Sequence, residues 1–379
     1  MADPRPGRDL VYLVPGFFGF EKLGPFEYFV HVQAILRAHL DPGWEIRVVP
    51  TPPTASLTER TRVLIDTIDA TAGDEDRLHL IGHSSGGLDV RLVTTPAAHF
   101  DPRASKIAAR VRSVVTVATP HRGTPLAAAF DGVIGKQLLA LTTRAAAGGL
   151  KRTTRGGPLI EYLAMISRDQ GLLTQLTPDA LDVFNATTPD APNVRYGCVV
   201  AMTPGRPQHP LYGALRRLSA RMPQNRAATL PGAAREALER AGAAAPTWKD
   251  SDGIVPTRSQ VWGEIVHAAA ADHLDVLGHY DWLRSGAPFG PTELETLWTH
   301  VAQFVHGDAL EPPLAPTPPG PSLLMRHRRR MAFAAAMLFA FVVTQPLVFA
   351  LGLDRWPYTD VLTFSVVAAA LALAVERWV

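Results

Sequence analysis

The sequence predicts an α/β protein whose mostly parallel sheet is covered by helices on both faces. Through the first third of the chain, apolar runs typical of buried strands alternate with amphipathic runs typical of helices. Three of the predicted strands end in special loops, with the sequences PGFFGF, GHSSGG and TPHRGT. Ligands of open parallel sheets bind outside the carboxyl ends of the strands. We therefore expect a functional site where these loops meet.

The composition is that of a globular protein with a large core. Of the 379 residues, 47% are hydrophobic, and the formal net charge is only +2. The one dense basic run lies beside an apolar stretch and lacks interleaved aromatic residues, which argues against nucleic-acid binding. The single cysteine, Cys198, excludes an intrachain disulfide and fits a reducing compartment. The apolar run after the first nine residues contains a Pro-Gly break, so we interpret it as a first core strand rather than a signal peptide.

The predicted elements follow one another at the spacing of strand–helix units. Apolar runs predict strands at 10–14, 45–49, 78–81, 111–118 and 194–202, with helices over 57–70 and from 88. A late strand and then a histidine-bearing loop fall within 264–282, and a last helix covers 291–306.

Two long segments interrupt this pattern. Residues 126–190 are rich in alanine and leucine at helical spacing, and residues 204–247 are rich in arginine and alanine. We expect both to be insertions that form a helical cap. The composition fits a lid that moves on contact with lipid as well as it fits a fixed cover.

The C-terminal end of the chain has a different character. Residues 307–325 are rich in proline, which favours an extended linker. Four arginines at 326–330 precede the run 331–353, which has no charged residue and can cross a hydrocarbon layer of ~30 Å at ~1.5 Å per residue. A second apolar segment covers 361–375 within a helix predicted to reach about 377.

We expect residues 326–379 to form a membrane anchor built as a transmembrane helical hairpin. A single crossing followed by an interfacial helix remains the alternative, because 15 uncharged residues are short for a span. Arginines beside a membrane span favour the cytosolic side, which places the main domain, 1–306, in the cytoplasm.

The stretch HLIGHSSGGLDVR, residues 79–91, carries the most specific local signal. It contains Gly82-x-Ser84-x-Gly86 between a predicted strand and a predicted helix. The glycines permit a sharp turn and close packing of strand against helix, which leaves Ser84 exposed at the apex. That context favours a nucleophilic serine over an ordinary Ser/Gly-rich loop.

A serine nucleophile needs a base, and the base needs a carboxylate that orients it. In folds of this class the order along the chain is serine, acid, histidine. Asp252, in DSDGIVP, and His273, in ADHLD, have this order. Asp250 is the alternative acid, and His267 and His279 are alternative bases.

Several neighbouring side chains have simpler interpretations. His83 and His121 adjoin the special loops and are expected to orient them. Asp89 and Arg91, on the helix behind Ser84, are expected to form a structural ion pair.

Charge that develops on a substrate oxygen needs backbone donors. Ser85, the residue after the nucleophile, offers one N–H, and Phe17, after the close-approach residue Gly16, offers the other. Phe18 and Phe20 are candidates for lining the substrate pocket.

With these residues in view, the chain resembles bacterial triacylglycerol lipases of the α/β-hydrolase superfamily. The resemblance covers roughly residues 10–305 and rests on the segments VPGFFGF, GHSSGGLDVR, VTVATPHRGTPLA, LTPDALDVFNATTPDAPNVRY, SDGIVP and DHLD. It implies Ser84, Asp252 and His273 as the catalytic triad, with Phe17 and Ser85 as backbone donors.

The chain also departs from this family at defined positions. Pro15 replaces the usual histidine before Gly16. Asp275 matches a family ligand of structural calcium, but His279 stands where the family has glutamine, and no upstream aspartate partner is evident. We therefore expect no metal and no cofactor.

The sequence thus predicts a membrane-anchored serine hydrolase that cleaves carboxylic esters of lipids through an acyl-enzyme. Its expected partners are an acyl-ester substrate and the membrane. A phospholipase or a deacylase of lipid-linked substrates is the alternative within catalysis. A non-catalytic binding module on a hydrolase scaffold is the alternative outside it.

Overall fold

The computed structural model describes residues 7–17, 19, 22–23, 26–97, 100–124, 169, 171–203, 247, 250–279 and 289–308. Phe18, Phe20, most of both predicted insertions and everything after residue 308 lie outside this set, including the predicted membrane hairpin. No helix within these ranges has both the length and the apolarity needed to cross a membrane. Contacts group Met1–Glu21 and Glu27–Thr317 into one compact unit, which contains the sheet and every predicted site residue that the structure describes.

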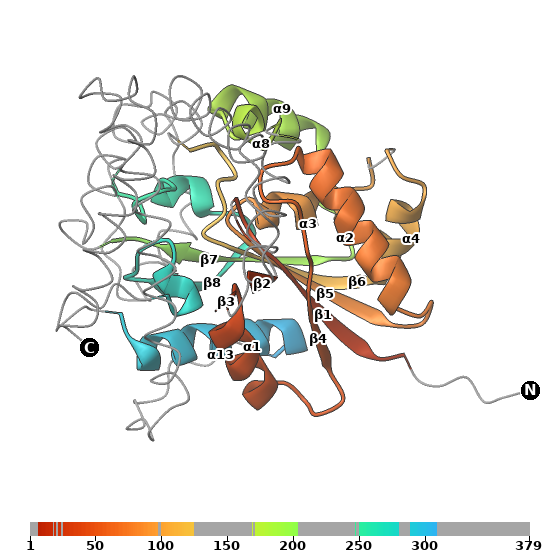
Figure 1. Cartoon of the computed structure of the whole chain (residues 1–379), viewed down its shortest axis with the longest axis horizontal. Coiled ribbons are helices and arrows are strands. Elements are labelled where there is room, and N and C mark those ends of the chain that lie inside the picture. The colour runs from red at the N-terminus through yellow and green to blue at the C-terminus, as the bar shows by residue number, and fades with distance from the viewer. Residues whose placement is uncertain are drawn as a thin grey trace, which may run out of the picture. The chain divides into compact units, whose positions relative to one another are not determined.

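A six-stranded parallel sheet forms the centre of this unit and confirms the predicted fold class (Figure 1). Its order is β4-β1-β5-β6-β7-β8. The strands are β1 (Asp9–Val14), β4 (Glu45–Val48), β5 (Arg77–His83), β6 (Val111–Val117), β7 (Arg195–Ala201) and β8 (Glu264–Ala269). Two short strands, β2 (Lys22–Leu23) and β3 (Phe26–Glu27), pair with each other in a separate two-stranded sheet.

Helices cover both faces of the sheet, as the alternating pattern predicted. On one face lie α1 (Val30–His39) and α13 (Pro291–His306); on the other lie α2 (Leu57–Thr71), α3 (Gly86–Thr94) and α4 (Arg103–Arg110) (Figure 1). Within the part of the predicted cap that is described, α8 (Gly171–Gln175) and α9 (Pro178–Thr187) are helical. Short 3-10 helices cover Thr257–Gln260 (η2) and Asp275–Leu277 (η3).

The central strands are apolar along their whole length because both faces are buried. Alternate residues of β1 enter different cores: Val11 and Leu13 pack with α1 and α13, whereas Leu10 and Tyr12 pack with α2 to α4. A continuous apolar run is the sequence pattern of such a strand.

The order in which strands are added reverses at β1: β4 lies on one side of it, and β5 and the later strands lie on the other. After β1 the chain continues into α1 on one face, and after β5 it continues into α3 on the other face. Ligands of open parallel sheets bind at such a switch point, outside the carboxyl ends of the strands. Ser84 lies at this point.

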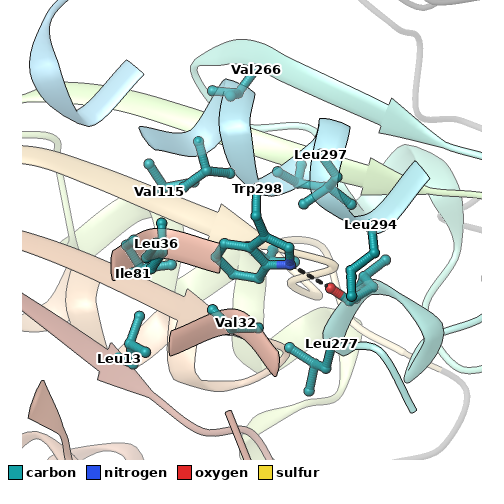
Figure 2. Packing of buried hydrophobic residues seen from close by; sticks show 14 of the residues in the cluster. Leu13, Val32, Leu36, Ile81, Val115, Val266, Leu277, Leu294, Leu297 and Trp298 are labelled. Atoms are coloured by element: carbon teal, nitrogen blue, oxygen red, sulfur yellow. Dashed lines mark hydrogen bonds between the residues drawn. The ribbon is translucent and has the colours of Figure 1, made fainter. Parts of the chain in front are cut away.

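Trp298 of α13 fills the middle of the core on the α1 side and also holds the loop after β8. Its indole is fully buried among Val32, Leu36 and their neighbours, and its Nε1–H donates to the Val276 carbonyl at 2.8 Å (Figure 2). Val276 belongs to η3, three residues after His273. The packing of α13 thus fixes the segment that carries the predicted base.

Candidate active site

Ser84 occupies a strained turn between β5 and α3. Its φ angle is +54°, a left-handed conformation that is rare for a residue with a side chain. The Ser84 N–H donates to the Val117 carbonyl at 2.8 Å, and its carbonyl accepts from the Gly87 N–H at 3.0 Å. Both peptide groups are therefore fixed, and the residue lies at the carboxyl end of the sheet. Only 7% of its surface is exposed, so the expectation of an exposed serine is wrong: the loops that converge on the turn cover it.

The glycines of the motif are required by close approach. A Cβ atom on Gly82 would lie 2.3 Å from the Gly86 backbone, and one on Gly86 would lie 2.3 Å from the Val14 carbonyl oxygen. On the opposite side, a Cβ on Gly16 would lie 2.5 Å from the Ser84 Cβ and 3.1 Å from its Oγ. Strand, helix and the loop after β1 therefore converge on the serine.

Asp252 and His273 form a buried pair. The His273 Nδ1–H donates to Asp252 Oδ2 at 2.7 Å, and the His273 backbone N–H donates to the Asp252 carbonyl at 3.0 Å. The other carboxylate oxygen, Oδ1, accepts from the N–H groups of Ile254 and Val255 at 2.9 and 2.7 Å. The Asp252 carboxylate is fully buried, and this arrangement orients the imidazole.

Gln260, in η2, completes the environment of Asp252. Its Nε2 donates to Asp252 Oδ2 at 3.1 Å and to the carbonyls of Ala201 and Val255, while its Oε1 accepts the Ala201 N–H at 2.7 Å. The amide is fully buried with both ends bonded. It ties the acid to the end of β7.

His83 links the serine strand to the predicted base. Its Nε2 lies 3.0 Å from the His273 carbonyl oxygen, and the two rings lie 4.8 Å apart between centroids. The structure thus places Ser84, Asp252 and His273 after the carboxyl ends of β5, β7 and β8, at the same edge of the sheet. Among the described residues, no hydrogen bond joins Ser84 to His273; such bonds in unliganded sites often tighten only when substrate binds.

Of the two predicted backbone donors, Ser85 follows Ser84 directly, and Phe17 follows Gly16, whose backbone approaches Ser84. Ser85 is the N-cap residue of α3, whose N-terminus favours negative charge. Phe17 follows Gly16 in a turn that the Gly19 N–H closes on the Gly16 carbonyl at 2.9 Å. Its ring packs against an apolar cluster that includes Leu57 of α2, Leu172 of α8 and Leu181 of α9.

The loop after β1 is also held by a buried ion pair. Arg60 of α2 contacts Asp89 of α3 at 2.7 Å and donates to the Pro15 carbonyl at 2.6 Å, and both side chains are fully buried. Burial raises the pKa of Asp89 to about 6, against the attraction of Arg60. The predicted Asp89–Arg91 pair is therefore wrong, because Asp89 faces α2.

Arg91 does not contact Asp89 but binds residues on the other side of α3. Its guanidinium stacks on the Trp262 ring at 3.4 Å and donates to the side chains of His121 and Asn185. His121 in turn contacts Thr116 Oγ1 at 3.1 Å. These contacts hold the TPHRG loop in place. His121 thus orients its loop, as expected from the sequence.

The alternative acid and bases have other partners. Asp250 accepts from the backbone N–H of Thr247, and the ring of His267 contacts His300 at 3.0 Å. His279 contacts the Tyr28 carbonyl through Nε2 at 2.9 Å.

The residues at the family's calcium position do not fit that metal. The Asp275 carboxylate accepts the Asp272 N–H at 3.2 Å, and the nearby His279 offers an imidazole where a hard cation prefers oxygen. Within the described ranges, no three acidic, histidine or cysteine side chains cluster as metal ligands.

Three residues of the site escaped the sequence interpretation: Tyr28, Arg60 and Gln260. Arg60 had a usable signal, since it falls on the buried face of an amphipathic helix with Leu57 and Leu64 and so needs a partner. Tyr28 acts through a contact with a distant part of the chain, and Gln260 joins the nearby acid loop to the distant β7; no local pattern marks either role.

Comparison with known proteins shows which of them share this fold. No protein-family profile matches the chain, and no curated protein matches it by sequence. Among solved structures, it is similar to a lipase of Staphylococcus hyicus, with 17% identity over 80% of this chain and 97% of that chain and a TM-score of 0.54. It is also similar to EstA from Clostridium botulinum, with 17% identity over 79% and 87% and a TM-score of 0.52. A metagenomic carboxyl esterase matches at 20% identity over 80% and 77%, with a TM-score of 0.51. The chain therefore has the α/β-hydrolase fold of bacterial lipases and esterases.

Proposed function

We propose that this protein is a serine hydrolase that cleaves carboxylic esters of lipids. The observation that carries the proposal is the placement of Ser84: a strained serine at the switch point of the sheet, with the His273–Asp252 pair linked to the same strand end through His83. Strain of this kind persists where the surrounding structure fixes it, and it clusters at active sites.

The residues supply each role that ester hydrolysis requires. Ser84 Oγ attacks the ester carbonyl while His273 Nε2 takes its proton, and Asp252 stabilises the resulting imidazolium. The backbone N–H groups of Phe17 and Ser85 bind the oxyanion. Collapse of the tetrahedral intermediate releases the alcohol, which takes the proton from His273. Water, activated by the same histidine, then cleaves the acyl-enzyme and restores the Ser84 hydroxyl.

A lipid substrate is supported by two independent features. The similar structures named above include a lipase and esterases. The sequence also carries the apolar segments 331–353 and 361–375, which we propose as a membrane anchor that keeps the catalytic domain, 1–306, beside the bilayer on its cytoplasmic side. The same anchor favours phospholipids or lipid-linked acyl groups as alternative substrates.

Replacement of the nucleophile tests the reaction class. We expect Ser84→Ala to lower kcat for p-nitrophenyl butyrate by about 10³-fold or more, because the proposed acyl-enzyme forms on the Ser84 hydroxyl. Ser113→Ala is the matched control, since Ser113 is also buried but lies on β6 far from its carboxyl end and contacts His79. Its kcat should stay near the wild-type value.

Undiminished turnover by Ser84→Ala would refute the assignment. A wild-type protein inactive on a panel of acyl esters and phospholipids, with and without detergent, would favour a non-catalytic binding module. Positional analysis of the products from mixed lipids separates a phospholipase from a neutral-lipid esterase.

A further inference from the structure

Tyr28 joins three segments of the proposed active site. Its side chain is 8% exposed, and its hydroxyl lies 2.8 Å from His83 Nδ1. The Gly16 N–H donates to the same phenolic oxygen at 3.4 Å. On its far side, His83 contacts the His273 carbonyl at 3.0 Å. One phenol thus connects the loop after β1, the residue before Ser84 and the backbone of His273.

The partners of His83 determine its tautomer. A carbonyl oxygen only accepts hydrogen bonds, so Nε2, which faces the His273 carbonyl, must carry the ring proton. Nδ1 then holds a lone pair and accepts from the Tyr28 hydroxyl. Complete burial, and then the proximity of His273, keep the pKa of His83 well below its usual value. The ring is therefore neutral and fixed in one orientation.

A second contact ties Tyr28 to the loop of the base. The His279 Nε2–H donates to the Tyr28 carbonyl at 2.9 Å, and the His279 backbone N–H donates to the Leu274 carbonyl at 3.2 Å. The ring of Tyr28 also packs edge-on against Phe29, at 4.8 Å between centroids. Tyr28 thus holds the segment 273–279 both through its hydroxyl and His83 and through its own backbone.

We propose that Tyr28 is a positioning residue: its hydroxyl holds the His83 ring in the orientation in which Nε2–H binds the His273 carbonyl, and so aligns the base with Ser84. This inference rests on the proposed function. It assigns Tyr28 no contact with the reacting atoms. Without the hydroxyl, His83 Nδ1 becomes a buried acceptor with no donor, and the opposite tautomer would direct a lone pair at the His273 carbonyl.

Tyr28→Phe removes the hydroxyl and keeps the ring, and Tyr12→Phe is its matched control. Tyr12, on β1, is also buried, and its hydroxyl contacts Thr71 Oγ1 at 2.7 Å. Thr71 already donates to the Thr67 carbonyl, so Tyr12 is a phenolic donor as Tyr28 is. We expect Tyr28→Phe to lower kcat for p-nitrophenyl butyrate by about tenfold or more while KM stays within about twofold. Tyr12→Phe should keep the wild-type kcat.

The tautomer of His83 gives a readout that activity does not. In ¹⁵N-histidine-labelled wild-type protein, His83 should show an unprotonated Nδ1 and a protonated Nε2 that do not titrate between about pH 5 and about pH 9. In Tyr28→Phe the Nδ1 resonance of His83 should shift, because this nitrogen loses its hydrogen-bond donor while the His273 carbonyl still holds the proton on Nε2. Tyr12→Phe should leave that resonance unchanged.

Each outcome decides the matter. A Tyr28→Phe variant with the kcat of Tyr12→Phe overturns the inference and leaves the proposed function intact. If Tyr28→Phe fails to fold, the wild-type spectrum decides, because a protonated Nδ1 or a titrating His83 overturns the inference alone. A wild-type protein with the expected tautomer but no ester hydrolysis overturns the proposed function, and the positioning role with it.

Discussion

Ser84 shows how a single residue can be held in an unfavourable conformation. The left-handed region costs a residue with a Cβ about 1–2 kcal/mol. Hydrogen bonds at both of its peptide groups and the glycine contacts on either side leave the backbone no alternative. The sequence predicted this turn because Gly82 and Gly86 are spaced for it.

Gln260 is one of the residues whose role the sequence did not reveal, and its replacement tests how far Asp252 depends on it. We expect Gln260→Met, which keeps the length of the side chain, to lower kcat/KM for p-nitrophenyl butyrate by about tenfold. It should also lower the free energy of unfolding by about 1–3 kcal/mol, because the Ala201 N–H loses its acceptor and Asp252 loses a donor. Steady-state kinetics and urea unfolding measure the two effects.

Gln303→Met is the control for this prediction, since Gln303 lies on α13 and has a buried amide oxygen without a hydrogen bond among the described residues. It should keep wild-type kinetics. Wild-type kinetics in Gln260→Met as well would show that Asp252 does not depend on this amide.

The elements were largely predictable because their signals are local. The helix over 291–306 was predicted with its bounds, since Pro291 starts it and Gly307, with φ +91°, ends it. The strand expected at 78–81 extends to His83. Gly82 and His83 are not part of the apolar run, but their backbones still pair with β6. Contacts between elements were not predictable: Tyr28 meets His83 across 55 residues, and Arg60 meets Asp89 across 29.

At the scale of the whole molecule, buried histidines make stability depend on pH. Burial lowers the pKa of His79 to about 4 and that of His267 to about 3. It also lowers the pKa of His83, His121, His279 and His300. Between these values and the ordinary value near 6.5, the unfolded chain binds more protons than the folded protein. The free energy of unfolding should therefore fall as the pH falls through this window.

Within the described part of the chain, two carboxyls oppose this trend. Burial raises the pKa of Asp89 to about 6 and raises that of Asp190, so the folded protein holds protons there that the unfolded chain lacks. The histidines with a lowered pKa named above outnumber these two carboxyls, so the effect of the histidines should dominate. We expect a lower urea midpoint at about pH 5 than at about pH 7.5. The free energy of unfolding should change by about 1.4 kcal/mol per pH unit for each net proton that the unfolded chain binds in excess. His79→Gln should reduce this change, and equal midpoints at both pH values would contradict the balance.

A mapped covalent adduct tests the central claim most directly. When the full chain is treated with a fluorophosphonate probe and digested, mass spectrometry should find one modified residue, Ser84. The rate of labelling should fall sharply in His273→Ala, because the serine is nucleophilic only beside its base. An adduct on a different residue, or ester hydrolysis that continues while Ser84 stays unmodified, would contradict the account.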